Sequence, residues 1–289
     1  MKIAESELII NPDGSIYHLN LLPEDIAETI IFVGDPDRVS HVSKHFDTIE
    51  VQKSKREFVT HTGTLKGKRL TVISTGIGTD NIDIVLNELD ALVNIDLKSR
   101  KVKDQLTSLE IIRIGTSGSL HSDIKVDEFL ISELAVGFDN LPHFYKDQFT
   151  ENKEIEVYFK KHTDWYSEKS SPYIVNADPG LVERLRSDET HMGFTATSIG
   201  FYGPQSRILR LEPQDRELND KLASFNYEGR RITNLEMETA GIYVMSKLLG
   251  HKAISMNCIL ANRPDGEFSK TPASSVNRLI RYTLEKITA

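Results

Sequence analysis

Short apolar runs that end at glycines constrain the fold of this chain more than any other feature. Ile30–Val33 stops at Gly34, and Leu109–Ile114 stops at Gly115. Runs of this length, bounded by turn residues, are typical of strands buried inside a sheet. Segments with helical periodicity alternate with them along the chain. The sequence therefore predicts a three-layer α/β/α sandwich around a mostly parallel or mixed central sheet.

Periodicity, caps and turn residues also predict the individual elements. A hairpin is expected at Glu57–Leu65 and Arg69–Ser74, and Asp80 is expected to cap a helix that runs to Val93. The chain has no internal repeat, low-complexity tract or linker, so we expect one domain over residues 1–289. The other expected elements are helices at Arg38–His45, Asp178–Ser187 (capped by Asp178), Glu238–Leu249 (closed by Gly250) and Pro272–Ile287, strands at Glu128–Leu134, Gly193–Ser198 and Ala253–Leu260, and a surface loop at Asp96–Ser108, while Phe144–Ser171 has no clean period.

Composition narrows the class of protein. With 289 residues, 39% of them hydrophobic, the chain can bury a sizeable core without disulfides. A net charge of −8 argues against a general surface for nucleic acid or anionic membranes. No run approaches the roughly 18 apolar residues of a membrane span, and residues 1–15 lack the apolar core of a signal peptide. The single cysteine, Cys258, fits a reducing compartment. We expect a cytoplasmic protein with no nucleic-acid or membrane partner.

Arginines close to two glycine turns predict an anion site. Gly34 and Arg38 follow one expected strand, and Arg113 and Thr116 lie at the end of another. Backbone N–H groups, forked guanidinium donors and a hydroxyl together suit phosphate, and loops beyond the carboxyl ends of parallel strands gather in space. The turn at Gly34 also has an ordinary structural interpretation. An arginine inside an apolar strand, such as Arg113, is costly to bury without a partner.

A second candidate site is the pair of glutamates that flanks Met237. Glu236 and Glu238 stand where the chain is expected to enter a helix. A carboxylate can accept hydrogen bonds from two ribose hydroxyls, and a methionine packs adaptably under a sugar ring. The two carboxylates share one side only if the segment is extended, and they diverge if it is already helical. The alternative is that both acids only stabilise the helix dipole.

The segment Phe201–Arg207 is a third candidate, and its glycine and proline mark a loop. If this loop is extended, Gln205 and Arg207 share a face. An amide both donates and accepts, so Gln205 matches the adjacent N–H and carbonyl of a uracil edge, and Arg207 can donate to the other carbonyl. An aromatic ring at Phe201 or Tyr202 can stack on the base. The alternative is a surface loop with aromatic anchors.

Other site signatures are missing. The nine histidines show no metal-ligand spacing, so no metal site is expected. Gly76-Ile77-Gly78 lacks the third glycine of a dinucleotide fingerprint, which favours a structural turn. Cys258 lies in an apolar run, so we expect it to pack in the core and not to act as a nucleophile.

Taken in order, these residues resemble the nucleoside phosphorylase family of the uridine phosphorylase type. The likeness runs from about Ile16 to Arg263, and the segments Asp96–Ser108 and Phe144–Ser171 depart from the pattern. The resemblance rests on seven strings in register: Tyr17-His18-Leu19, Gly34-Asp35-Pro36-Asp37-Arg38, Arg56-Glu57-Phe58, Ser74-Thr75-Gly76-Ile77-Gly78, Arg113-Ile114-Gly115-Thr116-Ser117-Gly118, Gln205-Ser206-Arg207 and Glu236-Met237-Glu238.

The resemblance implies a homodimer, or a hexamer built as a trimer of dimers, with sites shared between subunits. It implies inorganic phosphate as co-substrate and no organic cofactor. Glu57 resembles a monovalent-cation ligand of some members, but Asn81 stands where those members carry a serine, so this sequence departs from the cation-binding pattern. The implied roles are phosphate binding by Gly34, Arg38, Arg113, Thr116 and a neighbouring subunit's Arg56, ribose binding by Glu236, Met237, Glu238 and that neighbour's His18, and base binding by Gln205, Arg207 and Phe201 or Tyr202.

The activity implied by this resemblance is phosphorolysis of a pyrimidine nucleoside, uridine first, to free base and ribose 1-phosphate. Arg113, Arg207 and Glu238 are the catalytic candidates. Purine-specific relatives carry a proton-donating aspartate where this chain has Asn262, and an asparagine cannot supply that proton. The alternatives are a purine nucleoside phosphorylase or a nucleosidase of the same family, and a non-catalytic nucleoside-binding protein.

Overall fold

The computed structural model describes residues 2–146 and 151–289. Within these ranges a twelve-stranded mixed sheet forms the centre of the molecule, beside a small two-stranded sheet. The strands of the central sheet are β1 (Thr29–Val33), β2 (Thr48–Lys55), β3 (Phe58–Leu65), β4 (Lys68–Ser74), β7 (Glu110–Ser119), β8 (Phe129–Gly137), β9 (Tyr173–Asn176), β10 (Thr190–Thr197), β11 (Asn226–Tyr227), β12 (Arg230–Glu236), β13 (Lys252–Asn262) and β14 (Glu267–Phe268), and the small sheet pairs β5 (Ile95–Asp96) with β6 (Lys101–Val102).

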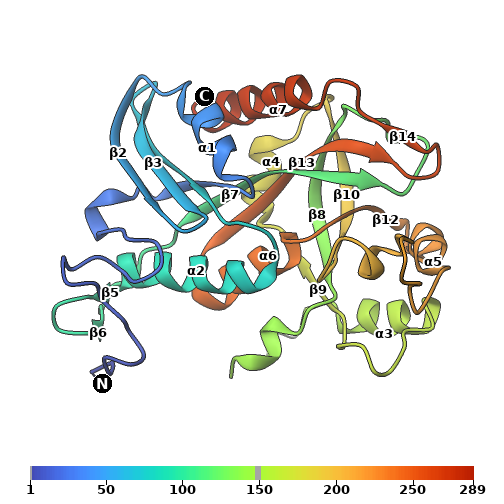
Figure 1. Cartoon of the computed structure of the whole chain (residues 1–289), viewed down its shortest axis with the longest axis horizontal. Helices are drawn as coiled ribbons and strands as arrows, with labels where there is room; N and C mark the ends of the chain where they lie inside the picture. Colours follow the sequence, from blue (N-terminus) through green and yellow to red (C-terminus); the bar gives the residue numbers. More distant parts are fainter. Residues whose placement is uncertain (1, 147–150) are drawn as a thin grey trace.

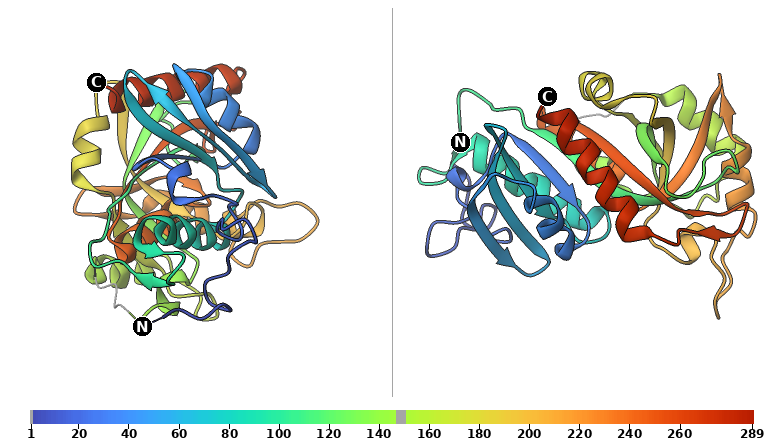
Figure 2. Two further views of the ribbon diagram at one scale, coloured as in Figure 1. Left: turned by 90° about the vertical axis from the view of Figure 1, so that its left-hand side faces the viewer. Right: turned by 90° about the horizontal axis from the view of Figure 1, so that it is seen from above.

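Helices cover both faces of the central sheet, as the sequence predicts (Figure 1). On one face α1, α4 and α7 pack over a buried cluster that includes Val39, Ile112 and Leu279. On the other face α2 and α6 pack against each other and the sheet; Figure 2 shows α7 crossing the face opposite to these two helices. The helices are α1 (Pro36–Ser43), α2 (Thr79–Asn94), α3 (Lys153–His162), α4 (Pro179–Leu185), α5 (Leu218–Ser224), α6 (Thr239–Leu249) and α7 (Pro272–Ile287), with the 3-10 turns η1 (Pro23–Asp25), η2 (Leu141–Phe144) and η3 (Gly203–Gln205).

Five strands of the sheet close on themselves. They follow the order β12-β10-β8-β13-β7, and β12 pairs with β7 as well, through Asn234 and Leu235. Each of these strands contributes one buried polar side chain to a chain of hydrogen bonds that we call the polar ring. Its members are Asn257, Ser132, Thr195, Asn234 and Ser117, joined in that order by contacts of 3.0, 2.5, 2.8 and 2.9 Å.

Several expected elements are confirmed by the structure. The apolar runs become β1 and the first half of β7, and α7 begins and ends where the periodicity predicts. Asp178 caps α4, because its carboxylate accepts a hydrogen bond of 2.9 Å from the backbone N–H of Leu181. Gly250 closes α6 in the left-handed region at φ 79°.

Other expectations were wrong in detail. The N-cap of α2 is Gly78, at φ 95°, and Asp80 lies one residue inside the helix. The segment after Ile114 is not a turn, because β7 continues to Ser119 in parallel register with β13. The edge strand β2 was not expected, since its alternating exposed residues carry little apolar signal.

Two stretches that depart from the family pattern also differ from a plain loop. The expected surface loop Asp96–Ser108 begins in β5 and contains β6. The unassigned stretch Phe144–Ser171 contains α3, and its residues 147–150 lie outside the described part of the chain, as does Met1 in the N-terminal stretch. No helix in residues 2–146 and 151–289 is long and apolar enough to cross a membrane.

Candidate active site

A cavity of about 820 Å³ opens where β1, β4 and β12 end and where β7 passes beside them. We call it the cleft. It brings together residues from all three candidate sites that the sequence predicts, which agrees with functional groups gathering beyond strand ends. The predicted site residues that line the cleft are Gly34, Arg38, Arg113, Thr116, Phe201, Gln205, Arg207, Glu236, Met237 and Glu238.

The two glutamates and Arg113 form one buried ionic group in the cleft. Nη2 of Arg113 lies 2.7 Å from Oε2 of Glu238 and 3.1 Å from Oε2 of Glu236. The three side chains belong to residues only 5–7% exposed. Glu236 ends β12 and Glu238 is the N-cap of α6, so the segment is still extended enough for both carboxylates to face the same guanidinium. The interpretation of the two acids as helix-dipole partners alone does not account for this pairing.

Each carboxylate is also held by neutral donors. Glu236 accepts hydrogen bonds from Oγ1 of Thr197 at 2.6 Å and from the backbone N–H groups of Glu238 and Thr239. Glu238 accepts a hydrogen bond of 2.9 Å from the backbone N–H of Gly78, at the N-terminus of α2. Both carboxylates therefore have fixed positions before any ligand binds.

Burial and charge shift the titration of this group. Burial raises the pKa of Glu238 above its usual value, and the nearby charge of Glu236 raises it further, against the lowering effect of Arg113. Burial opposes the charge of Arg113, but the two carboxylates outweigh it and raise the pKa of the guanidinium. Arg113 therefore remains a cation inside the cleft.

The predicted phosphate residues meet beside this group. Arg38 lies in the first turn of α1, after the N-cap Asp35, and its Nη1 lies 3.4 Å from the backbone oxygen of Ile114. Burial lowers the pKa of Arg38, and the positive charge of Arg113 lowers it further. Two guanidiniums that repel each other in a partly buried place favour an anion between them. Gly34 and Thr116 line the same wall.

The predicted base residues lie at the other end of the cleft. Their segment is the expected loop, but it is not extended, because Gly203–Gln205 forms the 3-10 turn η3 and Ser206 is left-handed at φ 54°. Gln205 and Arg207 nevertheless converge, with Nη1 of Arg207 donating to Oε1 of Gln205 at 2.5 Å. The guanidinium carbon of Arg207 also lies 3.7 Å from the centre of the Phe201 ring.

Three predicted residues do not line the cleft of their own chain. Tyr202 faces a second cavity, described below. His18 holds Glu88, with Nδ1 lying 2.6 Å from Oε1. Arg56 is exposed in the turn between β2 and β3, and within residues 2–146 and 151–289 it has no hydrogen-bonding or ionic partner.

Arg263 is a cation behind Gln205 to which the sequence analysis assigned no role. Its Nη1 donates to the backbone oxygen of Gln205 at 2.9 Å. Burial, together with the positive charge of Arg207, lowers the pKa of Arg263 to about 10. The one sequence feature that could have drawn attention to Arg263 is its position directly after Asn262. The amide of Asn262 itself is buried and donates to the backbone oxygens of His121 and Ile124, so it anchors a loop and does not line the cleft.

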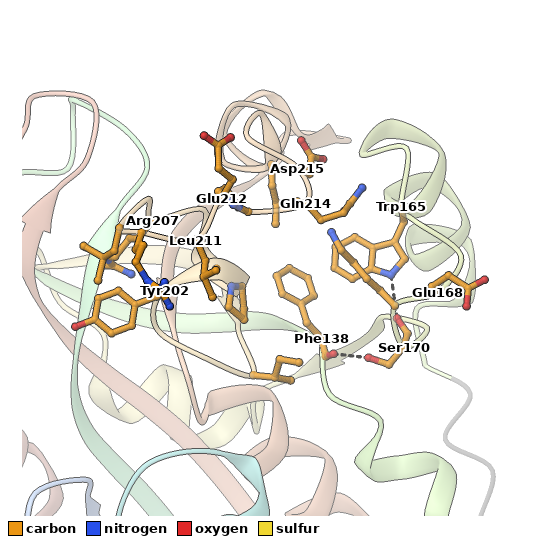
Figure 3. Close-up of a pocket in the computed structure, with 18 residues that line it drawn as sticks. Phe138, Trp165, Glu168, Ser170, Tyr202, Arg207, Leu211, Glu212, Gln214 and Asp215 are labelled. Carbon is orange, nitrogen blue, oxygen red and sulfur yellow. Dashed lines mark hydrogen bonds between the residues drawn. The ribbon is translucent and has the colours of Figure 1, made fainter.

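A second cavity of about 810 Å³ lies behind the η3 segment (Figure 3). Phe138 and Trp165 form its floor, and the ring N–H of Trp165 donates to the backbone oxygen of Ser170 at 2.9 Å. The cavity shares Arg207 with the cleft but contains none of the buried acids. The cleft, and not the second cavity, is therefore the candidate active site.

The described residues offer no obvious metal centre. Across 2–146 and 151–289 no group of three or more histidines, cysteines, aspartates or glutamates could hold a metal ion. Glu57 and Asn81 line the cleft next to Gly76. Cys258 is fully buried, and burial raises the pKa of its thiol to about 12, so it is inert as a nucleophile at neutral pH.

Comparisons with known proteins agree with this arrangement. A family model described as the phosphorylase superfamily matches residues 28–287. The chain is 28% identical to a uridine phosphorylase of Thermococcus kodakarensis, over 93% of this chain and 85% of that protein, and 26% identical to a DeoD-type purine nucleoside phosphorylase of Shewanella denitrificans, over 93% and 96%. A crystal structure of a Trypanosoma brucei nucleoside phosphorylase with uridine phosphorylase activity superimposes with a TM-score of 0.88 at 29% identity, over 98% of this chain and all of that one.

Proposed function

This chain belongs to the phosphorylase superfamily, and we propose that it catalyses the phosphorolysis of a pyrimidine nucleoside, uridine first, to free base and ribose 1-phosphate. The observation that carries the proposal is the content of the cleft. One end holds two fixed carboxylates beside two guanidiniums, and the other end holds an amide beside Arg207. A sugar, an anion and a base edge each find their matching groups there.

The carboxylates suit the ribose. Glu238 and Glu236 are held in place by backbone N–H groups, and ionised carboxylates accept hydrogen bonds from sugar hydroxyls. Met237 lies between them and lines the cleft. Glu238 is the member we assign to catalysis, because it fixes the sugar while positive charge grows on it.

The arginines suit phosphate. Arg38 and Arg113 are the cations on the wall next to the carboxylates, and Gly34 and Thr116 complete that wall. Arg113 contacts both carboxylates, so it links the groups that would hold ribose to the wall that would hold phosphate. Oriented in this way, a phosphate oxygen attacks the anomeric carbon without a covalent enzyme intermediate.

The base end suits a departing pyrimidine anion. When the bond between the anomeric carbon and the ring nitrogen breaks, its electron pair leaves with the base. The amide of Gln205 matches a uracil edge, and Arg207 donates where negative charge develops, as the donors of an oxyanion hole do. Arg207 rests against Phe201 and Gln205, so it lies at the base end before substrate arrives.

The alternatives fit these observations less well. A nucleosidase uses water and has no need for Arg38 and Arg113 beside the sugar site. Similarity to a purine nucleoside phosphorylase supports the purine alternative, but the pairing of Gln205 with Arg207 matches a pyrimidine. A non-catalytic binder has no need for a cation shared between two buried acids.

We also propose that the active form is a homodimer, alone or as part of a hexamer, in the cytoplasm. Arg56 and His18 do not line the cleft of their own chain, and Arg56 is exposed on a turn. Both are therefore available to a neighbouring subunit. Mixing two weakened variants, His18→Ala and Glu238→Gln, tests this: shared sites predict that hybrid dimers regain activity, and a mixture no more active than its parts would contradict it.

The activity itself is tested by incubating the purified protein with uridine, with and without phosphate, and separately with inosine. We expect uracil and ribose 1-phosphate only when phosphate is present. Release of uracil without phosphate would support a nucleosidase instead, and cleavage of inosine alone would contradict the assignment of Gln205 and Arg207. If titration calorimetry showed nucleoside binding and neither nucleoside were cleaved, the protein would be a binder.

A further inference from the structure

The guanidinium of Arg113 occupies a space that a missing side chain leaves free. A Cβ atom on Gly115 would lie 1.8 Å from Nη1 and 2.3 Å from Cζ of Arg113. The Arg113 side chain therefore folds back over the backbone of Gly115. The backbone of Gly115 is not left-handed, so this position needs a glycine for space and not for its conformation.

Asn257 stands directly across from this space. In the parallel register of β13 with β7, Asn257 is paired with Gly115, and Ser255 is paired with Arg113. Nη1 of Arg113 donates to Oδ1 of Asn257 at 3.0 Å and to Oγ of Ser255 at 3.3 Å. The guanidinium is thus held on one edge by β13 and on the other edge by the two carboxylates.

The amide of Asn257 is itself held in one orientation. Its Nδ2 donates to Oγ of Ser132 at 3.0 Å and lies 3.3 Å from Oγ of Ser255. Because the nitrogen is used by these hydroxyls, the oxygen faces Arg113. Asn257 and Ser255 are fully buried and neither lines the cleft, so they act on a ligand indirectly, and Arg113 is the cleft residue that both of them contact.

We propose that Asn257 is a positioning residue for Arg113, a role that rests on the proposed phosphorolysis. It fixes the Nη1 edge of the guanidinium, so that Nη2 meets the carboxylates and the cation faces the phosphate wall. Ser255 is a weaker second support. Without Asn257 the guanidinium keeps its ion pairs but loses the contact that fixes its rotation, and phosphate binding suffers more than folding.

The test compares four variants by their kinetic constants and melting temperatures. Asn257→Leu removes the acceptor with little change of volume, and Ser255→Ala removes the second one. We expect Asn257→Leu to raise the KM for phosphate roughly tenfold or more, and Ser255→Ala to raise it by about threefold. The matched control is Asn94→Leu, a buried asparagine far from the cleft whose amide bonds Asp90 and Thr107; it should lower the melting temperature without changing the KM for phosphate.

Asn257→Asp supplies a readout that a purely structural role would not move. A protonated aspartic acid offers a carbonyl acceptor and one donor, as the amide does, whereas the ionised form competes with phosphate for Arg113. The ratio of its KM for phosphate to that of the wild type should therefore approach one as the pH falls. This variant also decides the matter, together with Ser255→Ala, if Asn257→Leu does not fold.

Wild-type values of the KM for phosphate in folded Asn257→Leu, or at every pH in Asn257→Asp, would overturn the proposal. Failure of the proposed function would look different, because the wild type itself would then release no base with phosphate. In that case the affinity of the same variants for uridine, measured by calorimetry, tests the role of Asn257, since Arg113 also orients the two carboxylates. Equal nucleoside affinity in all four variants would then contradict the positioning role.

Discussion

The two ends of the cleft are built in different ways. The end that we propose binds ribose and phosphate consists of strand ends and helix starts, and its acids and Arg113 are almost fully buried. The end that we propose binds the base is a loop around η3, where Phe201 is 51% exposed and Gln205 is buried. Figure 2 shows the segment between η3 and α5 projecting from the body of the protein.

This difference separates two tasks. Groups that must be aligned before the reaction are fixed by backbone hydrogen bonds and by ion pairs in a dry place. The groups that we propose for recognition of the base lie on a loop, and loops tolerate changes of sequence and conformation better than strand ends do. The fixed end should therefore make the larger contribution to the rate of the reaction, and the loop end should make a smaller one and determine the choice of base.

The largest effect is expected at the fixed end. Glu238→Gln keeps the shape of the side chain but removes its charge, so Arg113 loses one of its two partners and the ribose loses an ionised acceptor. We expect kcat/KM for uridine to fall by roughly 10²–10³, measured by uracil release. A melting temperature close to that of the wild type would show that the loss is not unfolding. Activity within about threefold of the wild type would contradict the division between the two ends.

A smaller effect is expected from Arg207→Ala, at the loop end. The variant should lose roughly 10² in kcat on uridine, because the charge on the departing base is no longer stabilised. Its KM for phosphate should stay unchanged, since Arg207 lies away from the phosphate wall. If the variant turned over uridine at the wild-type rate, Arg207 would not stabilise the leaving base.

The pH dependence should belong to the fixed end alone. Burial raises the pKa of Glu238, so in the folded protein this carboxyl takes up a proton at a higher pH than an ordinary glutamate does. If the ionised form holds the ribose, kcat/KM falls about tenfold per pH unit below an inflection that lies above about pH 4.3. A pH–rate profile measures this limb. The Arg207→Ala variant should show the same acid limb. If the limb persisted unchanged in Glu238→Gln, the titrating group would be a residue other than Glu238.

The smallest effect is expected from two neighbouring aromatics compared with each other. Tyr202→Ala should change kcat/KM by less than about threefold, because Tyr202 lines the second cavity and not the cleft. Phe201→Leu should cost roughly tenfold, because the ring under Arg207 is lost. Equal losses in steady-state kinetics would show that the second cavity takes part in binding the base.

Sequence was a good guide to the fixed end of the cleft. Apolar runs located β1 and β7, and the polar residues after them meet in space because strand ends meet. The pairing of Arg113 with both glutamates could not be predicted, although the cost of burying Arg113 alone indicated that a partner exists. That partner lies more than a hundred residues away along the chain, and no local pattern reports such a contact.

The loop end shows where local patterns fail. Gln205 and Arg207 would share a face if their loop were extended, yet η3 and the left-handed Ser206 bring them together by a turn. Glycine and proline predicted a turn somewhere in this segment but not its type. In the same way Gly78 replaced Asp80 as the cap of α2, because its N–H is bound by Glu238 from the other half of the chain.

The polar ring has a direction. Arg113 donates to Asn257, which donates to Ser132, and Thr195 donates to Asn234, which donates to Ser117. The hydroxyl proton of Ser117 is thus left over at the end of the series, and no acceptor for it exists in the part of the chain described here. Ser117 lines the cleft, so this hydroxyl proton is available to an acceptor atom of a bound ligand. A ligand contact at Ser117 would then be continuous with buried hydrogen bonds that run through all five of the closed strands.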